Sequence, residues 1–449
     1  MTRRPPYVLP AIVFSQFAGT SLWFAGNAVL ADLRLPGAAD EAGIQRITQA
    51  VQLGFIVGTL VFALFAVADR RSPRLVFLLC SLAGAAANLA GAHLARDVTS
   101  LMALRFCTGF FLAGIYPVGM KVAAGWYERG LGSALGYLVG ALVLGTAFPH
   151  LLQALGETGF FVVEVRGGPE RARSVLSFVS ALAGLGGCAL YFLVPDGPYL
   201  PRVPYRGETP VNTLSKNIRK TRVPRAATKP WEGALVTDPD AKPGKDSAGS
   251  FAIVSVFQNA RFRRAALGYF GHMWELYAFW AFTPIFLTAL FEKHAVKSEA
   301  SVSLWSFLII AVGFFGCALG GYASLRAGSA RVALAQLAVS GGLCLLSPLL
   351  FLDIVPLWIA LACMLLWGVT VIGDSPQFSA LVAANAPRQL VGSALTVVNS
   401  IGFSLTIVSI EVVGSWARCV SDPAWLFIML APGPLAGLLA MRGFLRDSG

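Results

Sequence analysis

Four charged side chains lie well inside long apolar stretches of the sequence: Arg105, Glu275, Asp374 and Glu411. A charge at the centre of a helix in hydrocarbon costs at least about 2.5–3.5 kcal/mol, so each of them predicts a functional or paired role. Coupling proton movement to a conformational change needs a group that binds and releases a proton as its surroundings change. We expect this role at Glu275, Asp374 and His272, which lies three residues before Glu275 on the same helical face. The alternative for all three is a structural ion pair or hydrogen bond.

We expect different roles for the other two charged residues, Arg105 and Glu411. Arg105 is a candidate clamp for an anionic group of a bound molecule, or a partner for backbone carbonyls at helix ends and a nearby carboxylate. Its place in the outer half of its apolar stretch favours the structural role. Glu411 lies close to the end of its stretch, which favours a solvated position.

Uncharged polar and aromatic residues follow helical stripes in the same stretches. Residues at spacings of three or four lie on one helix face, so such stripes predict the lining of a polar cavity. Amides and hydroxyls also join neighbouring helices in membranes, and tryptophans pack, so these structural roles stay open. The candidate cavity residues are Gln16, Thr20, Trp23, Asn27, Arg105, Tyr116, Trp367, Gln377 and Asn399.

The composition indicates that these residues lie in transmembrane helices. The chain has 449 residues, of which 56% are hydrophobic and 13% charged, against about 45–50% and 25% in soluble domains. A transmembrane helix needs about 20 apolar residues, and the runs are continuous, as in helices, not alternating, as in barrel strands. Twelve runs fit: Val8–Leu30, Thr48–Ala68, Leu75–Ala95, Leu101–Ala124, Ser133–Leu155, Val175–Val194, Ala266–Leu290, Val302–Ser324, Val332–Leu352, Pro356–Ser379, Gly392–Val413 and Trp425–Phe444.

The segment between the sixth and seventh runs has the composition of a linker. It is rich in proline, lysine and arginine and poor in apolar residues. We therefore expect three parts: a six-helix bundle over 1–194, a basic cytoplasmic linker over 195–264, and a second six-helix bundle over 265–449. Residues 251–264 fit either an amphipathic helix at the membrane surface or a basic flank of the seventh run. Basic loops place both termini in the cytoplasm and account for the net charge of +12 without nucleic acid.

The two halves share a short sequence repeat. Gly114-Ile-Tyr-Pro117 in the fourth run corresponds to Gly373-Asp-Ser-Pro376 in the tenth, and each is followed by a Gly-Ser-Ala-Leu segment. Parallel repeats of six helices place a solute site between the halves, near the membrane midplane. Gly114, Pro117, Gly373 and Pro376 are expected to weaken their helices and act as bending points.

With this repeat and this six-plus-six layout, the chain resembles the major facilitator superfamily along essentially its whole length. Asp69, Arg70 and Arg74, between the second and third runs, are similar to that family's gating motif, although Phe65 and Ser72 stand where glycines are expected. Arg105 is similar to the family's arginine in the fourth span. The resemblance implies an all-α polytopic membrane protein with twelve transmembrane helices in two pseudo-symmetric bundles. It also implies a secondary transporter of the bacterial inner membrane type, working as a monomer by alternating access.

The sequence leaves the cargo open. Residues Ala394–Gly402 resemble the eleventh span of nitrate and nitrite porters, but the second and eighth runs lack that family's paired arginines. A small organic solute, with protons as the coupling ion, is therefore preferred to a small anion. A membrane receptor or scaffold that does not transport is the alternative of another class. Nucleotide-binding and metal-binding motifs are missing from the sequence, so we expect neither an enzyme nor a cofactor or metal.

Overall fold

The structure is a computed structural model that describes residues 5–36, 41–65, 67–127, 131–157, 168–198, 256–296, 299–387 and 390–446. These residues form helices joined by short turns, and within them there is no β-strand. The fold is therefore all-α, as the sequence predicts.

The first part of the chain forms the helices α1 (Val8–Thr20), α2 (Ala25–Leu33), α3 (Glu41–Leu64), α4 (Val67–Arg70), α5 (Pro73–Leu94), α6 (Val98–Leu112), α7 (Tyr116–Ala124), α8 (Leu131–Glu157) and α9 (Pro169–Leu193). The second part forms α11 (Ala260–Lys293), α12 (Glu299–Ala311), α13 (Gly313–Ala327), α14 (Ser329–Leu346), η1 (Ser347–Phe351), α15 (Leu357–Gly373), α16 (Ser375–Asn385), α17 (Val391–Cys419), η3 (Pro423–Leu430) and α18 (Pro432–Arg446).

Twelve helical segments are long and apolar enough to cross a membrane, and each corresponds to one predicted run. Several of these segments consist of two consecutive helices. The first is α1 with α2, the fourth is α6 with α7, the eighth is α12 with α13, and the tenth is α15 with α16. The breaks in the fourth and tenth segments lie beside Gly114 and Pro117, and at Asp374 between Gly373 and Pro376. The break at 21–24 has no glycine or proline, and the sequence did not predict it.

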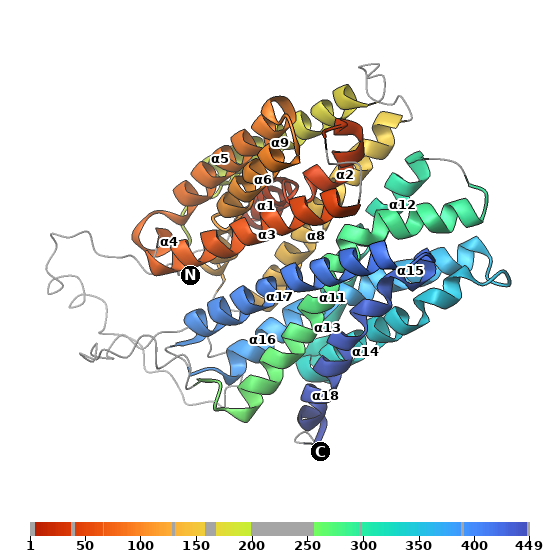
Figure 1. The fold of residues 1–449 in the computed structure, drawn as a ribbon. Helices are drawn as coiled ribbons and strands as arrows, with labels where there is room; N and C mark the ends of the chain where they lie inside the picture. Colours follow the sequence, from red (N-terminus) through yellow and green to blue (C-terminus); the bar gives the residue numbers. More distant parts are fainter. Residues whose placement is uncertain are drawn as a thin grey trace, which may run out of the picture.

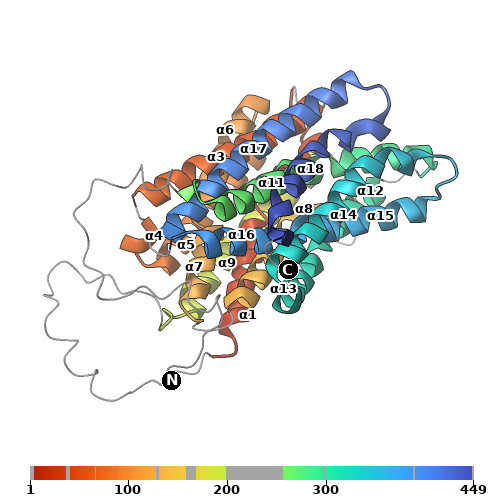
Figure 2. The same cartoon turned by 90° about the horizontal axis from the view of Figure 1, so that it is seen from below.

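The helices are arranged in two groups that follow the order of the chain. Figure 1 shows α1–α9, coloured red to yellow, beside α11–α18, coloured green to blue. The groups touch along α3 and α17, which lie side by side in both Figure 1 and Figure 2, and along α8 with α12 and α13. Any space between the groups is therefore bounded on two flanks by these helix pairs.

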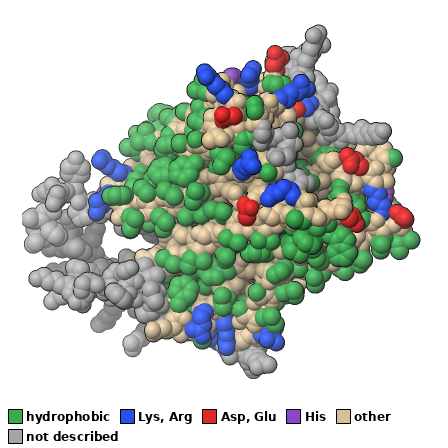
Figure 3. Space-filling view, in the orientation of Figure 1, with side chains coloured by type: hydrophobic (Ala, Val, Ile, Leu, Met, Phe, Trp, Pro, Cys, Tyr) green, Lys and Arg blue, Asp and Glu red, His purple; other side chains and the backbone are tan. Residues whose placement is uncertain are grey.

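The outer surface is suited to lipid. Figure 3 shows hydrophobic side chains over much of the visible face, with most Lys and Arg side chains in clusters towards its edges. Large apolar side chains such as Leu64, Phe192 and Leu325 are more than two-thirds exposed. A soluble monomer rarely exposes so large an apolar area, whereas a membrane protein buries it in hydrocarbon.

Polar contacts fix the ends of several helices. Arg74, at the start of α5, donates to Asp196 at 2.7 Å and to the Val194 carbonyl at 2.9 Å, and the Trp126 indole donates to the Pro195 carbonyl. The first residues of the linker are thus fastened to the first helix group. Arg70 is exposed, and the side chain of Asp69 lies outside the described residues.

The α6 helix begins at a capping box. Asp97 accepts from the backbone N–H of Ser100 at 2.7 Å and from its hydroxyl at 2.9 Å. These hydrogen bonds, the backbone one first, lower the pKa of the Asp97 carboxyl below its usual value.

The seventh segment begins within the predicted linker. Helix α11 starts at Ala260, where Asn259 caps the backbone N–H groups of Arg261 and Phe262. Arg261, Arg263 and Arg264 therefore lie in the first turns of this long helix. The rest of the linker, 199–255, lies outside the described residues.

Candidate transport pathway

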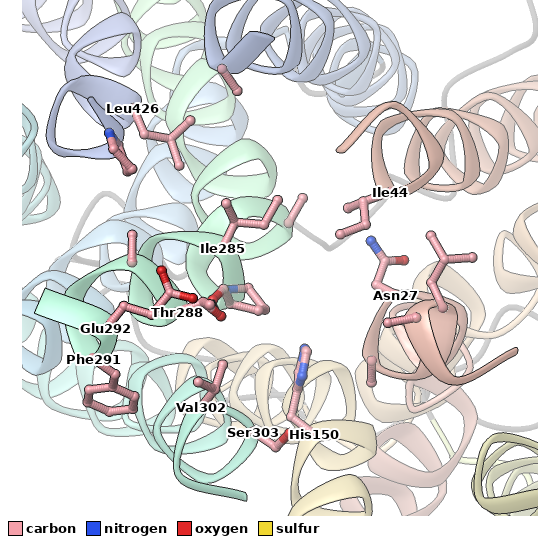
Figure 4. Close-up of a pocket in the computed structure, with 18 of the residues that line it drawn as sticks. Asn27, Ile44, His150, Ile285, Thr288, Phe291, Glu292, Val302, Ser303 and Leu426 are labelled. Atoms are coloured by element: carbon pink, nitrogen blue, oxygen red, sulfur yellow. Dashed lines mark hydrogen bonds between the residues drawn. The ribbon is translucent and has the colours of Figure 1, made fainter. Parts of the chain in front are cut away.

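A cavity of about 1240 Å³ lies between the two helix groups. Its walls come from α2, α8 and the start of α3 on one side, and from α11, α12 and the turn between α17 and η3 on the other. Figure 4 shows Asn27, Ile44 and His150 facing Ile285, Thr288 and Leu426 across this space. The polar lining residues are Asn27, Asp32, Arg34, His150, Gln153, Thr288, Glu292, Ser303, Ser421 and Asp422.

The cavity opens at the end of the helices remote from the two termini. Its lining is drawn from the ends of the odd-numbered segments and the beginnings of the even-numbered ones. Arg34, Thr288, Glu292 and Asp422 are exposed, so the wall reaches solvent at that end. The deeper lining residues His150 and Trp280 are buried.

Aromatic rings close the cavity at its deep end. This aromatic cluster comprises Trp23, Phe24, Phe55, Tyr277, Trp280 and Phe403. Trp23 stacks on Phe403 at 5.8 Å between ring centroids and lies 5.6 Å from Tyr277, so the contacts cross from the first helix group to the second. Trp280 belongs both to the cluster and to the cavity lining, and Tyr277 lies about one helical turn before it on α11, so the cluster forms the inner boundary of the cavity.

A buried His–Asp pair lies deeper still. His272 Nδ1 is 2.8 Å from Asp374 Oδ1, and the side chains are 1% and 0% exposed. The rings of Tyr269 and Phe378 flank the imidazole at 5.8 and 6.0 Å. Because His272 is eight residues before Trp280 on α11, it lies about 12 Å further along the helix, on the far side of the aromatic cluster.

Glu275 occupies a different environment from Asp374. Its carboxylate accepts hydrogen bonds from the Trp367 indole at 2.5 Å, the Ser340 hydroxyl at 2.9 Å and the Cys344 thiol at 3.4 Å. These donors lie on α14 and α15, inside the second helix group, and Glu275 is not in the cavity lining. His272 therefore pairs with Asp374, although it shares a helical face with Glu275.

Arg105 binds the backbone at the break of the first segment. Its guanidinium donates to the Leu22 carbonyl at 3.0 Å, to the Trp23 carbonyl and to Asn88 Oδ1 at 3.1 Å. The break at 21–24 leaves these carbonyls without helical partners, and a bilayer offers no water to satisfy them. The arrangement corresponds to the structural role that the sequence favoured for Arg105.

A second buried arginine neutralises a cavity carboxylate. Arg171 donates to both oxygens of Asp32, at 2.9 Å each, and Gln153 donates to the same carboxylate. Asp32 and Gln153 line the cavity, and Arg171 lies behind them at the start of α9. Such a two-pronged pair holds the charge of Asp32 in place on the wall.

The predicted stripes are distributed over more than one site. Of the candidate cavity residues, Asn27 alone lies in the cavity lining. Trp23 belongs to the aromatic cluster, and the Trp367 indole donates to Glu275. Gln16 and Gln377 are buried, the Thr20 hydroxyl donates to the Gln16 carbonyl, and Tyr116 and Asn399 are half-buried.

Sequence reasoning missed the wall formed by α8. His150 and Gln153 are both polar, lie three residues apart and interrupt an apolar run, so the helical spacing that marked the other stripes was present here too. Asp32 and Arg171 gave no comparable signal, because their pairing joins helices far apart in the chain.

The family is decided by a match along most of the chain. The model of the Major Facilitator Superfamily matches residues 8–410. The chain belongs to this family.

Solved structures share the fold at low sequence identity. The nucleoside transporter NupG, as a D323A mutant, is 14% identical with a TM-score of 0.64, covering 97% of this chain and 99% of that one. A bacterial homolog of the human lysosomal transporter Spinster, inward-facing and unoccupied, is 16% identical with a TM-score of 0.66, covering 99% of both chains. The proton:xylose symporter XylE, bound to 6-bromo-6-deoxy-D-glucose, is 12% identical with a TM-score of 0.69, covering 98% of this chain and 96% of that one.

A comparison with curated protein sequences gives no match. The superfamily fold with twelve membrane-spanning helices makes this chain a multi-pass membrane transporter.

Proposed function

We propose that this chain is a proton-coupled secondary transporter that moves a small organic solute by alternating access. The observation that carries the proposal is the position of the aromatic cluster, between a solvent-reaching cavity and the buried His272–Asp374 pair. A carrier needs a solute site open to one side at a time and a proton site whose exposure changes with it.

The two helix groups supply the moving parts. Among the described residues, the cavity reaches solvent at the end remote from the termini, and rings from both groups close its opposite end. Rocking of one group on the other would part Trp23 and Phe24 from Tyr277 and Phe403, and would close the present opening. His272 and Asp374 would then face the newly opened side.

The proton step follows from the exposure of the pair. While His272 and Asp374 are buried together, the pair keeps any proton that it carries, because neither side chain can exchange protons with water. When the pair faces solvent, the proton leaves for water or is taken from it. Binding of solute in the cavity and proton exchange at the pair are thereby tied to the same rocking movement.

The neighbours support a small solute without identifying it. NupG is described as a nucleoside transporter and XylE as a proton:xylose symporter. Both terminal nitrogens of Arg105 donate to backbone carbonyls and Asn88, which makes this arginine a poor clamp for an anion and disfavours a small anion.

The arrangement in the membrane completes the proposal. We place both termini in the cytoplasm and the cavity on the outer side of a bacterial inner membrane, with bundles over 1–194 and 265–449 joined by the linker 195–264. The chain works as a monomer, because both helix groups and the cavity between them belong to one chain.

Uphill transport in liposomes tests the coupling. The purified chain is reconstituted, and a panel of neutral, cationic and anionic organic solutes and nitrate is screened for uptake driven by a proton gradient. For a transported solute, Asp374→Asn is expected to abolish accumulation against a gradient while exchange continues, because the asparagine cannot carry the proton. Glu275→Gln is the matched control, and it should keep uphill transport.

Two results would count against this proposal. Full uphill transport by Asp374→Asn would remove the His272–Asp374 pair from the coupling. If no solute in the panel drove flux or bound to the protein, transport itself would be contradicted and a receptor or scaffold role would replace it.

A further inference from the structure

The cavity wall carries polar atoms that have no hydrogen-bond partner among the described residues. They are Asn27 Oδ1, Gln153 Oε1, His150 Nε2 and Trp280 Nε1, and all four residues line the cavity. Buried polar atoms are nearly always paired in proteins, by protein, water or ligand. Four unpaired atoms around one cavity therefore indicate what a bound molecule has to offer.

The amide of Asn27 has a fixed orientation. Asn27 Nδ2 donates to the Thr48 hydroxyl oxygen at 2.6 Å, and the Thr48 hydroxyl donates to the Ile44 carbonyl at 2.6 Å. Since the only hydrogen of that hydroxyl is already used, its oxygen needs a donor, and the Asn27 amide cannot be reversed. Asn27 Oδ1 is left as a free acceptor.

The same argument fixes Gln153. Its Nε2 donates to Asp32 Oδ2, and an ionised carboxylate only accepts. The bidentate pair with Arg171 holds the Asp32 carboxylate in place. Gln153 Oε1 is therefore a second fixed acceptor, on the same side of the cavity as Asn27.

The remaining two atoms complete the pattern. Trp280 Nε1 is a donor only, and it comes from α11 on the opposite wall. His150, 3% exposed, points towards the open space in Figure 4, and its Nε2 can donate or accept according to the tautomer. We call the four residues Asn27, His150, Gln153 and Trp280 the inner wall. It offers two acceptors on one side, one donor on the other, and one group that can donate or accept.

The inner wall is also electrically balanced. Asp32 is paired with Arg171, and the other charged lining residues, Arg34, Glu292 and Asp422, are exposed at the solvent end. Among the described residues, a solute with a net charge would find no unpaired counter-charge beside the four atoms. A hydroxyl group, in contrast, both donates and accepts, and polyols carry several without charge.

We propose that this inner wall binds an uncharged, hydroxyl-rich organic solute, with Asn27 and Gln153 accepting from its hydroxyls and Trp280 donating to one of its oxygens. His150 pairs with a further hydroxyl. The four atoms are covered by protein in this conformation, so the neighbouring side chains have to move aside as the solute enters. This proposal rests on the proposed transport function and specifies its solute class.

Binding and uptake with defined probes test the proposal. The probes are the neutral polyols glucose, xylose and inositol, the charged counterparts glucosamine and gluconate, and the apolar cation tetraphenylphosphonium. We expect at least one neutral polyol to stabilise the purified chain against heat and to enter liposomes, and the charged counterparts to do neither. Loss of one hydrogen bond typically weakens binding by up to about ten-fold.

Variants that remove one polar ring nitrogen identify the site. His150→Phe and Trp280→Phe each remove the polar atom and keep a ring, and each should weaken binding of that polyol by about three- to ten-fold. Trp274→Phe is the control, because it makes the same change on the same helix where the indole donates to the Met429 carbonyl, outside the cavity. It should leave polyol affinity unchanged.

The outcomes separate this proposal from the transport function. If glucosamine, gluconate or tetraphenylphosphonium is transported and no neutral polyol binds, the solute class proposed here is wrong while transport stands. The site is equally wrong if a polyol binds with unchanged affinity to both His150→Phe and Trp280→Phe. If no probe and no solute of the wider panel binds, the transport proposal falls as well.

Discussion

Two buried carboxylates of this chain, Glu275 and Asp374, differ in the groups that surround them. Glu275 accepts from three neutral donors within one helix group, whereas Asp374 meets a titratable imidazole at 2.8 Å. Only the second arrangement places the carboxylate beside an imidazole, a group that can take up a proton. At the scale of single residues, our proposal of coupling at Asp374 therefore rests on the partner of this carboxylate and not on its burial alone.

Arg105 offers a direct test of a structural charge. Arg105→Gln is expected to lower the free energy of unfolding by about 2–4 kcal/mol, because the Leu22 and Trp23 carbonyls lose charge-assisted hydrogen bonds in a place without water. Thermal and denaturant unfolding in detergent measure the change. Arg105→Lys keeps the charge but loses the planar guanidinium, so its free energy of unfolding should lie between those of the unsubstituted chain and Arg105→Gln. Unchanged stability with lost solute binding would instead assign Arg105 to the solute site.

At the scale of helices, α3 and α17 are joined by a polar contact that crosses between the two groups. Gln45 and Gln49 on α3 both donate to Glu411 on α17, and Arg418 donates back to Gln45 at 2.8 Å. The contact lies beside the cavity, between the lining residues Ile44 and Ala417. Because every bond joins one helix group to the other, the rocking movement has to rearrange it.

Breaking this contact should shift the conformational balance. Glu411→Ala removes the shared acceptor, and we expect spin labels on the outer ends of α3 and α17 to report a larger fraction of molecules with these ends apart. Each lost hydrogen bond is worth about 0.5–1.5 kcal/mol, so the shift in the two-state equilibrium is on the order of ten-fold. Ser404→Ala, which removes a hydroxyl bonded only to its own helix, is the control on α17. Equal distance distributions in Glu411→Ala and the control would contradict this role.

Helices also show how far sequence reasoning reaches. Span length and apolar content are local properties, so all twelve segments were predictable from the chain alone. The breaks beside Gly114 and Gly373 had a local signal, whereas the carbonyls freed at the break at 21–24 are bound by Arg105, which is more than 80 residues away. The Asp32–Arg171 and Gln45–Glu411 contacts likewise join distant helices, and no spacing within one helix could indicate them.

At the scale of the whole molecule, the cavity and the chain ends lie towards opposite membrane faces, so one labelling experiment fixes the orientation. In a cysteine-free background, Thr288→Cys places a thiol on the exposed cavity wall, and Ala327→Cys places one at the opposite end of the eighth segment. With the termini in the cytoplasm, a membrane-impermeant thiol reagent added to intact cells should label Thr288→Cys and spare Ala327→Cys. In inside-out vesicles the reagent should label Ala327→Cys and spare Thr288→Cys, because Thr288 lies at the end of the cavity that faces away from the cytoplasm. Labelling of Ala327→Cys from outside intact cells would place the termini outside, and the cavity would then open towards the cytoplasm.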